Sequence, residues 1–139
     1  MITETEYIDS IEDTRVRCAI LREGAGADIE VDMVDLNNLD EMRQIIGSDI
    51  DVVYRRIGSV SCTIICDDVG RLTHRTPTIY KTCGKSGLSG PSFCAPAIYG
   101  TVIIAGQDED GEPEDLTHDD IREIIEHIGL VGEQGALFI

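Results

Sequence analysis

Basic and hydroxyl side chains gather in the middle of this chain, although the protein as a whole is strongly acidic. The formal net charge is -16, yet residues 52–107 hold six bases and two acids and carry +4. Arginine forks and hydroxyl groups bind phosphate and carboxylate oxygens well. We therefore predict a binding site for a small anionic, nucleotide-like ligand in this region. Its candidate residues are Arg55, Arg71, Arg75, Thr76, Thr78, Tyr80, Lys81 and Lys85.

The two flanking segments have the opposite charge. Residues 1–51 and residues 108–139 each carry a formal charge of -10. Such a polyanion repels DNA and anionic lipid, so we expect neither nucleic acid nor a membrane as a partner. The acidic segments also indicate an alternative function, in which the protein mimics DNA and binds a DNA-binding protein.

The basic residues also have a purely structural interpretation. They could pair with surplus carboxylates on the surface of the fold, where an exposed ion pair contributes about 0 to 1 kcal/mol. The two interpretations differ in whether the cations converge on one concave surface or lie apart, each beside its own carboxylate.

Catalytic and metal-binding motifs are incomplete in this sequence. Gly84-Lys85-Ser86 is similar to the end of a P-loop, but Ile79 occupies the position of its leading glycine. The three histidines lack metal-site spacing, and the acidic run 108–112 lacks the register of an EF-hand. A nucleophile pair of Cys83 or Cys94 with His74 has no specific support. We expect a binding protein with no cofactor, no metal and no catalytic residue.

The cysteines indicate a reducing compartment. Five cysteines in a chain without an export signal are expected to be free thiols, and we predict a protein of the host bacterial cytosol. Cys62 and Cys66 lie in an apolar run, where cysteine usually behaves as a small buried hydrophobe. A metal site built on this pair would need two further ligands.

Two helices and a hairpin have clear local signals. Residues 37–47 begin with asparagine and end with glycine, as a short capped helix does. Residues 117–120 have the spacing of a capping box, and isoleucines at 121, 124, 125 and 128 form one helical stripe ending at Gly129. Residues 51–57 and 60–66 read as strands joined by a Gly58-Ser59 turn. Further strands are predicted at residues 15–22, 29–34 and 97–106.

These elements predict an α+β fold, with a mixed, mainly antiparallel sheet of about five strands and two helices packed on it. Residues 1–13 are expected to be loosely held, and residues 14–139 to form a single domain. We predict a long irregular loop at about 71–96, of the kind that serves for binding. The apolar tail either docks on the domain or contacts a partner, and its apolar residues are Leu130, Val131, Leu137, Phe138 and Ile139.

The order of these signals resembles a small uncharacterised domain family found in phages, prophages and mobile elements of gut and Gram-positive bacteria. The similar stretches cover about 100 residues. They are Leu39–Gly47, Ile50–Val53, Ile64–Leu72, Ile98–Gly106 and Leu116–Ile121. The chain departs from the family after Thr76-Pro77-Thr78, where a Gly/Ser/Cys-rich extension replaces a short segment with proline and asparagine.

The resemblance implies a mixed α/β fold and a phage accessory role, and it transfers no catalytic residue. Small phage proteins of this kind often act against host defence. For the alternative function, the resemblance therefore implies a DNA mimic or protein-interaction inhibitor of a host DNA-binding defence enzyme. We therefore expect sequestration of a nucleotide immune signal, with Tyr54, Tyr80 or Tyr99 stacking on the base. A homo-oligomer that shares a ligand site between subunits is left open.

Overall fold

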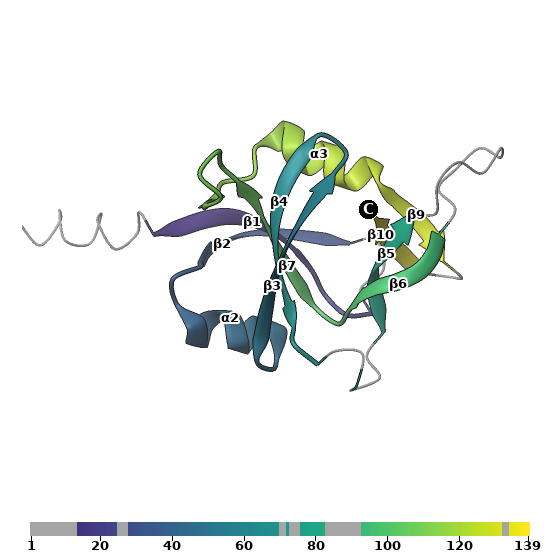
Figure 1. Cartoon of the computed structure of the whole chain (residues 1–139), viewed down its shortest axis with the longest axis horizontal. Helices are drawn as coiled ribbons and strands as arrows, with labels where there is room; N and C mark the ends of the chain where they lie inside the picture. Colours follow the sequence, from purple (N-terminus) through teal and green to yellow (C-terminus); the bar gives the residue numbers. More distant parts are fainter. Residues whose placement is uncertain (1–13, 25–27, 70–71, 73–75, 83–92, 132–133) are drawn as a thin grey trace, which may run out of the picture.

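The computed structural model describes residues 14–24, 28–69, 72, 76–82, 93–131 and 134–139. Within them, ten strands form two sheets and two helices pack beside the larger sheet (Figure 1). The prediction of an α+β fold with mostly antiparallel strands is therefore confirmed. The prediction of a single sheet of about five strands was wrong.

The larger sheet, called sheet A, is antiparallel throughout. Its strand order is β2-β1-β7-β4-β3, and a short β8 also pairs with β7. β7 lies at the centre of the sheet and all but its last residue are buried. The strands are β1 (Arg15–Leu21), β2 (Ile29–Asp35), β3 (Ile50–Ile57), β4 (Val60–Asp67), β7 (Val102–Gln107) and β8 (Pro113–Glu114).

The smaller sheet, called sheet B, has the order β6-β5-β10-β9. β10 runs parallel to β5, whereas the other two pairs are antiparallel. The strands are β5 (Pro77–Thr82), β6 (Phe93–Tyr99), β9 (Ile128–Val131) and β10 (Gln134–Phe138). In the tail, Leu137 and Phe138 are buried in the domain, whereas Leu130 is 79% exposed.

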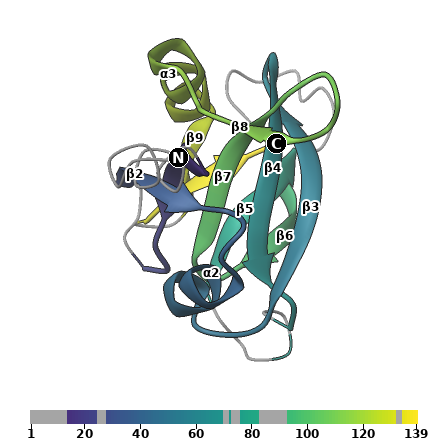
Figure 2. The same ribbon diagram turned by 90° about the vertical axis from the view of Figure 1, so that its left-hand side faces the viewer.

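Each face of sheet A has its own apolar core. On one face, Met42 and Ile46 of α2 (Leu39–Ile46) pack against a cluster that includes Ile65 and Ile103. Figure 2 shows α2 close to the sheet, on the side away from α3. The short helix is therefore held by two buried side chains as well as by its caps.

The other face of sheet A packs against both α3 (His118–Glu126) and sheet B. Ile124 of α3, Ile79 of β5 and Leu137 of β10 are fully buried in this cluster. Burying one such side chain contributes about 1.5 to 3 kcal/mol. Because the two sheets share this core, a strand of sheet B can lie opposite the edge of sheet A.

The helix starts follow the predicted capping patterns. Asn38 accepts a hydrogen bond from the Glu41 backbone N–H, and Gly47 ends α2 with a positive φ of 88°. Thr117 and Asp120 form both hydrogen bonds of the predicted capping box of α3. Neither helix in the described part of the chain is long and apolar enough to cross a membrane.

The end of α3 differs from the prediction. The helix stops at Glu126, and His127 caps it, so Gly129 lies inside β9 rather than at the helix end. Ile124 is buried, but Ile125 is 50% exposed. The chain leaves the helix early because Ala136 and Leu137 of β10 pair with Gly129 and Ile128.

Two other predicted segments are also subdivided. Residues 97–106 form the end of β6 and the whole of β7, which belong to different sheets. Gly100, with φ of 82°, makes the corner between them. The region 71–96, predicted as a long connection with at most short extended pieces, contains β5 and the start of β6 among its described residues. Residues 1–13 lie outside the described residues.

The β3–β4 hairpin has the predicted two-residue turn, and its tip is attached to α3. Glu123 accepts hydrogen bonds from the Ser59 backbone N–H at 2.8 Å and from the Ser59 hydroxyl at 2.5 Å. These hydrogen bonds lower the pKa of the Glu123 carboxyl, since they favour its charged form. The turn glycine, Gly58, has φ of 60°.

We expect Gly58→Ala to destabilise the protein by more than about 1 kcal/mol, because an alanine is strained at positive φ. A Cβ there would also collide with the Glu123 carboxylate and lie 2.7 Å from Cε1 of His127. Gly24→Ala is the matched control, since Gly24 has φ of 79° and, apart from its chain neighbours, no described residue has an atom within 4 Å of the added Cβ. Urea denaturation measures both free energies of unfolding. Equal losses would show that the contact with α3 has no effect.

We expect Glu123→Gln to lower stability at neutral pH, because it removes the charged acceptor of the Ser59 hydrogen bonds. The folded pKa lies below the ordinary glutamate value of about 4.3, so the ionised group stabilises the fold above that pH. The difference between wild type and variant should shrink as the pH falls through that value and the lower folded pKa. Thermal melts from pH 7 to pH 3 measure it, and a constant difference would contradict the assignment.

Candidate functional site

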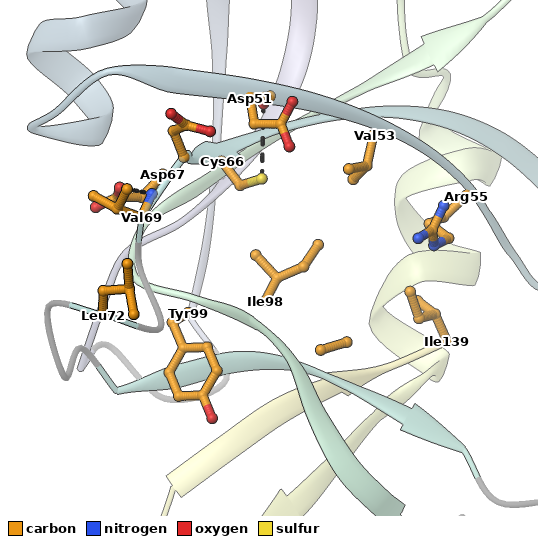
Figure 3. A pocket seen from close by; sticks show the side chains of 12 residues that line it. Asp51, Val53, Arg55, Cys66, Asp67, Val69, Leu72, Ile98, Tyr99 and Ile139 are labelled. Atoms are coloured by element: carbon orange, nitrogen blue, oxygen red, sulfur yellow. Dashed lines mark hydrogen bonds between the residues drawn. The ribbon is translucent and has the colours of Figure 1, made fainter.

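A cavity of about 500 Å³ opens between the edge of sheet A and strand β6 of sheet B. We call it the intersheet cleft. β3 forms one wall with Asp51, Val53 and Arg55, and residues 97–99 of β6 form the opposite wall (Figure 3). Ligand pockets typically have volumes of 300 to 1,000 Å³, so a small molecule fits.

The two charged residues of β3 mark opposite ends of the cleft. Asp51, Val53 and Arg55 share one face of the strand because alternate side chains point the same way. Figure 3 shows Val53 between the two charges. At 3.3 to 3.4 Å per residue, Asp51 and Arg55 are separated by ~13 Å along the strand. The cleft is thus polar at both ends and apolar in the middle.

Three cations gather at one end. A neighbouring cavity of about 340 Å³ shares Arg55, Ala97 and Ile139 with the cleft, and adds Arg56 and Lys81. We call Arg55, Arg56 and Lys81 the basic group. Two come from β3 and the third from β5, so the basic group spans both sheets.

The basic group, like Arg17, differs from the other described arginines in its partners. No ion pair joins it to a carboxylate within the described residues, and Arg55 donates to the carbonyl of its neighbour Tyr54 at 2.8 Å. Arg17 likewise donates to a carbonyl, that of Leu116. The remaining described arginines each have a carboxylate within 4 Å: Arg15–Glu41, Arg22–Glu30, Arg43–Asp49 and Arg122–Asp119.

The opposite end of the cleft is acidic. Asp67 and Asp68 follow one another where β4 ends, close to Asp51, and we call these three residues the acidic end. Asp67 is 7% exposed, and its Oδ1 accepts a hydrogen bond from the Val69 backbone N–H at 2.9 Å. No cluster of three or more histidine, cysteine or acidic side chains in the described ranges is arranged to hold a metal ion.

The predicted site residues fall into three sets. Arg55 and Lys81 both line the neighbouring cavity, Arg55 also lines the cleft, and Thr76 lies exposed just before β5. Thr78 and Tyr80 point inward, which removes them from the cleft surface. The Thr78 hydroxyl donates to the Gly100 carbonyl at 2.5 Å, and Tyr80 stacks on Phe138. Three more candidates lie outside the described residues: Arg71, Arg75 and Lys85.

Sequence reasoning missed the acidic end and the apolar wall from β6. The alternation of Asp51, Val53 and Arg55 was the available signal, because it puts two opposite charges on one strand face. Of the tyrosines considered for stacking on a base, Tyr99 lines the cleft and Tyr54 is 54% exposed on β3.

Comparison with known families identifies the chain. A family model described as "Domain of unknown function (DUF3846)" matches residues 16–129. The chain belongs to this family. The match confirms the expected membership of an uncharacterised family, and it includes β3, β5 and β6, which hold the basic group and both cleft walls. Searches of curated proteins and of solved structures found no match.

Among the residues whose side chains are described, the family region contains three cysteines with buried, free thiols, namely Cys18, Cys62 and Cys66. Burial raises the pKa of Cys18 and Cys62 to about 12. Burial raises that of Cys66 to about 11, with the carboxylates of the acidic end adding to the rise and Arg55 opposing it. The expectation that Cys62 and Cys66 are small buried hydrophobes is confirmed.

We expect Cys66 to resist alkylation in the native protein although it lines the cleft. At pH 8 a thiol with a pKa of about 11 is about 0.1% thiolate, and the thiolate is the reactive form. Iodoacetamide labelling followed by peptide mass spectrometry measures the modification, with urea-denatured protein as the control. Equal labelling of Cys66 in native and denatured protein would contradict the burial described here.

Proposed function

We propose that the protein is a binding protein that captures a small anionic ligand, such as a nucleotide, in the intersheet cleft. The observation that supports this most strongly is how the side chains of the basic group are placed and which partners they have. Arg55, Arg56 and Lys81 line one cavity that shares three lining residues with the cleft, and no carboxylate among the described residues pairs with them. Within the described part of the chain, these three cations are therefore available to an external anion.

The energetics favour an external anion over the protein's own carboxylates. Exposed ion pairs contribute little, because water screens them and long side chains lose entropy. A hollow that excludes part of the solvent strengthens charge-assisted hydrogen bonds, and a hydrogen bond to a charged group contributes about 1.5 to 3 kcal/mol. Two arginines and one lysine can together bind a phosphate through several such bonds.

The rest of the cleft suits the remainder of a nucleotide. Tyr99, Ile98 and Leu72 offer apolar and aromatic surface for a base or another flat group. The acidic end, ~13 Å away from Arg55 along β3, offers acceptors for hydroxyl or amino groups. The ligand we propose is therefore anionic at one end and rich in hydrogen-bond donors at the other.

Capture without turnover is the proposed role. The phage resemblance of the sequence suggests that such capture would act against host defence, by withholding a nucleotide signal. The DNA-mimic alternative has less support, because two of its carboxylates have internal partners. Asp108 accepts hydrogen bonds from the backbone N–H groups of Asp110 and Glu112, and Asp120 caps α3.

Isothermal titration against cyclic nucleotides and ADP-ribose-type nucleotides tests the proposal. We expect micromolar or tighter binding of at least one anionic nucleotide by the wild type. Lys81→Glu should weaken that binding at least about tenfold, because it removes a charged hydrogen-bond donor and adds repulsion.

Arg122→Glu is the matched control, since it makes the same change of charge on an exposed residue of α3. It should leave the affinity unchanged. The absence of micromolar binding across the panel would remove the proposal, as would equal losses in the two variants. Loss of activity against a host DNA-binding enzyme on neutralising residues 108, 110, 112 and 114 would instead support the DNA mimic.

A further inference from the structure

β3 has an unpaired side. It is the last strand of sheet A and pairs only with β4 among the described strands, and Figure 2 shows it at the margin of the sheet. Seven of its eight residues are exposed or half-buried. A long open edge of this kind presents a row of backbone donors and acceptors to another strand.

The hydrogen bonds of β3 show which backbone groups face outward. Ile57 and Val60 flank the two-residue turn, so Ile57 pairs inward with β4, and alternate residues back to Asp51 do the same. The groups of Val52, Tyr54 and Arg56 therefore point to the open side. Two of them are capped by neighbouring side chains: Asp51 accepts from the Val52 N–H at 2.9 Å, and Arg55 donates to the Tyr54 carbonyl.

The sequence of this edge is complementary to itself. In an antiparallel pair of two β3 strands centred on Val53, outward-facing Val52 pairs with Tyr54 of the partner subunit, and the reverse. The same register sets Asp51 opposite Arg55 of the partner subunit at both ends. These are positions without backbone hydrogen bonds between them, where side chains approach most closely.

We propose that two copies of this chain associate through β3 in this register, so that sheet A continues across a two-fold axis. The two side chains that cap the edge of β3 then change their hydrogen-bond partners. Asp51 and Arg55 release the Val52 N–H and the Tyr54 carbonyl to the partner's backbone, and pair with each other across the interface. Val52, 40% exposed, and Tyr54, 54% exposed, cover one another on the opposite face of the sheet.

The charge distribution favours this edge over the rest of the surface. Two copies that each carry -16 repel one another, but residues 52–107 carry +4 and include most of β3. Shifted registers are less complementary. Centred on Tyr54, the pair sets Val53 opposite Arg55 of the partner subunit and leaves Asp51 without a cation. Centred on Val52, it also leaves Asp51 without a cation and sets Arg55 opposite Asp49, which already pairs with Arg43 of its own chain.

The pairing goes beyond ligand capture and leaves room for it. It places each intersheet cleft beside the two-fold axis, since Asp51, Val53 and Arg55 belong to a cleft wall and to the paired face at once. Arg56 and Lys81 remain available to an anion. The partner's Asp51 and a bound anion compete for Arg55. Association of the two copies and ligand binding are therefore linked through the Arg55 guanidinium.

Sedimentation of the full chain over a range of concentrations tests the pairing. We expect a reversible dimer for the wild type. Asp51→Arg and Arg55→Asp should each weaken it at least about tenfold, because each sets like charges opposite one another at both ends. The double variant Asp51→Arg/Arg55→Asp should restore the dimer, since it exchanges the two charges.

The single variants control for net charge, because one makes the chain less negative and the other more negative. Their folding is checked by circular dichroism. Hydrogen exchange of the wild type gives a second measurement: the Val52 and Tyr54 amides should exchange more slowly as the protein concentration rises. A monomer at all concentrations, single variants that dimerise like the wild type, or a double variant that fails to recover would each overturn the pairing.

Discussion

The corner at Gly100 fixes how the two sheets meet, and the intersheet cleft depends on it. Its φ of 82° turns the chain from β6 of sheet B into β7 of sheet A. The Gly100 N–H donates to the Thr76 carbonyl at 2.9 Å, and its own carbonyl accepts from the Thr78 hydroxyl. The start of β5 is therefore fastened to the same corner. With both β5 and β6 anchored there, Lys81 and Tyr99 are held opposite β3.

Short-range sequence patterns were sufficient to predict the parts of the fold that are stabilised by contacts between residues close in sequence. The caps at Asn38 and Thr117, and the turn at Gly58-Ser59, lie within a few residues of the groups they bind. The strands of sheet B could not be read in this way. β5 pairs in parallel with β10, more than 50 residues later, and its Thr- and Pro-containing sequence has no apolar alternation. Long-range pairing overrides weak local preference there.

The charge of the candidate site could be predicted from the sequence, but its geometry could not. Segregation of bases from acids indicated that Arg55 and Lys81 serve a common purpose, and both line connected cavities. Which side chains of β5 face the cleft depends on strand register, and no periodic pattern revealed that a strand was present. Tyr80 therefore looked like a stacking residue but lies against Phe138. The acidic end was missed although the predicted hairpin sets Asp51 opposite Cys66, next to Asp67.

Sheet B can form completely only after its strand β10 has been synthesised. β5 can pair with β6 once residue 99 has left the ribosome, but its other neighbour, β10, spans residues 134–138. Until then Leu137 is missing from the core between the sheets, and one side of β5 is open to solvent. β5, which carries Lys81, therefore gains its second neighbouring strand late. A nascent chain can form the β3–β4 hairpin of sheet A well before the two sheets are complete.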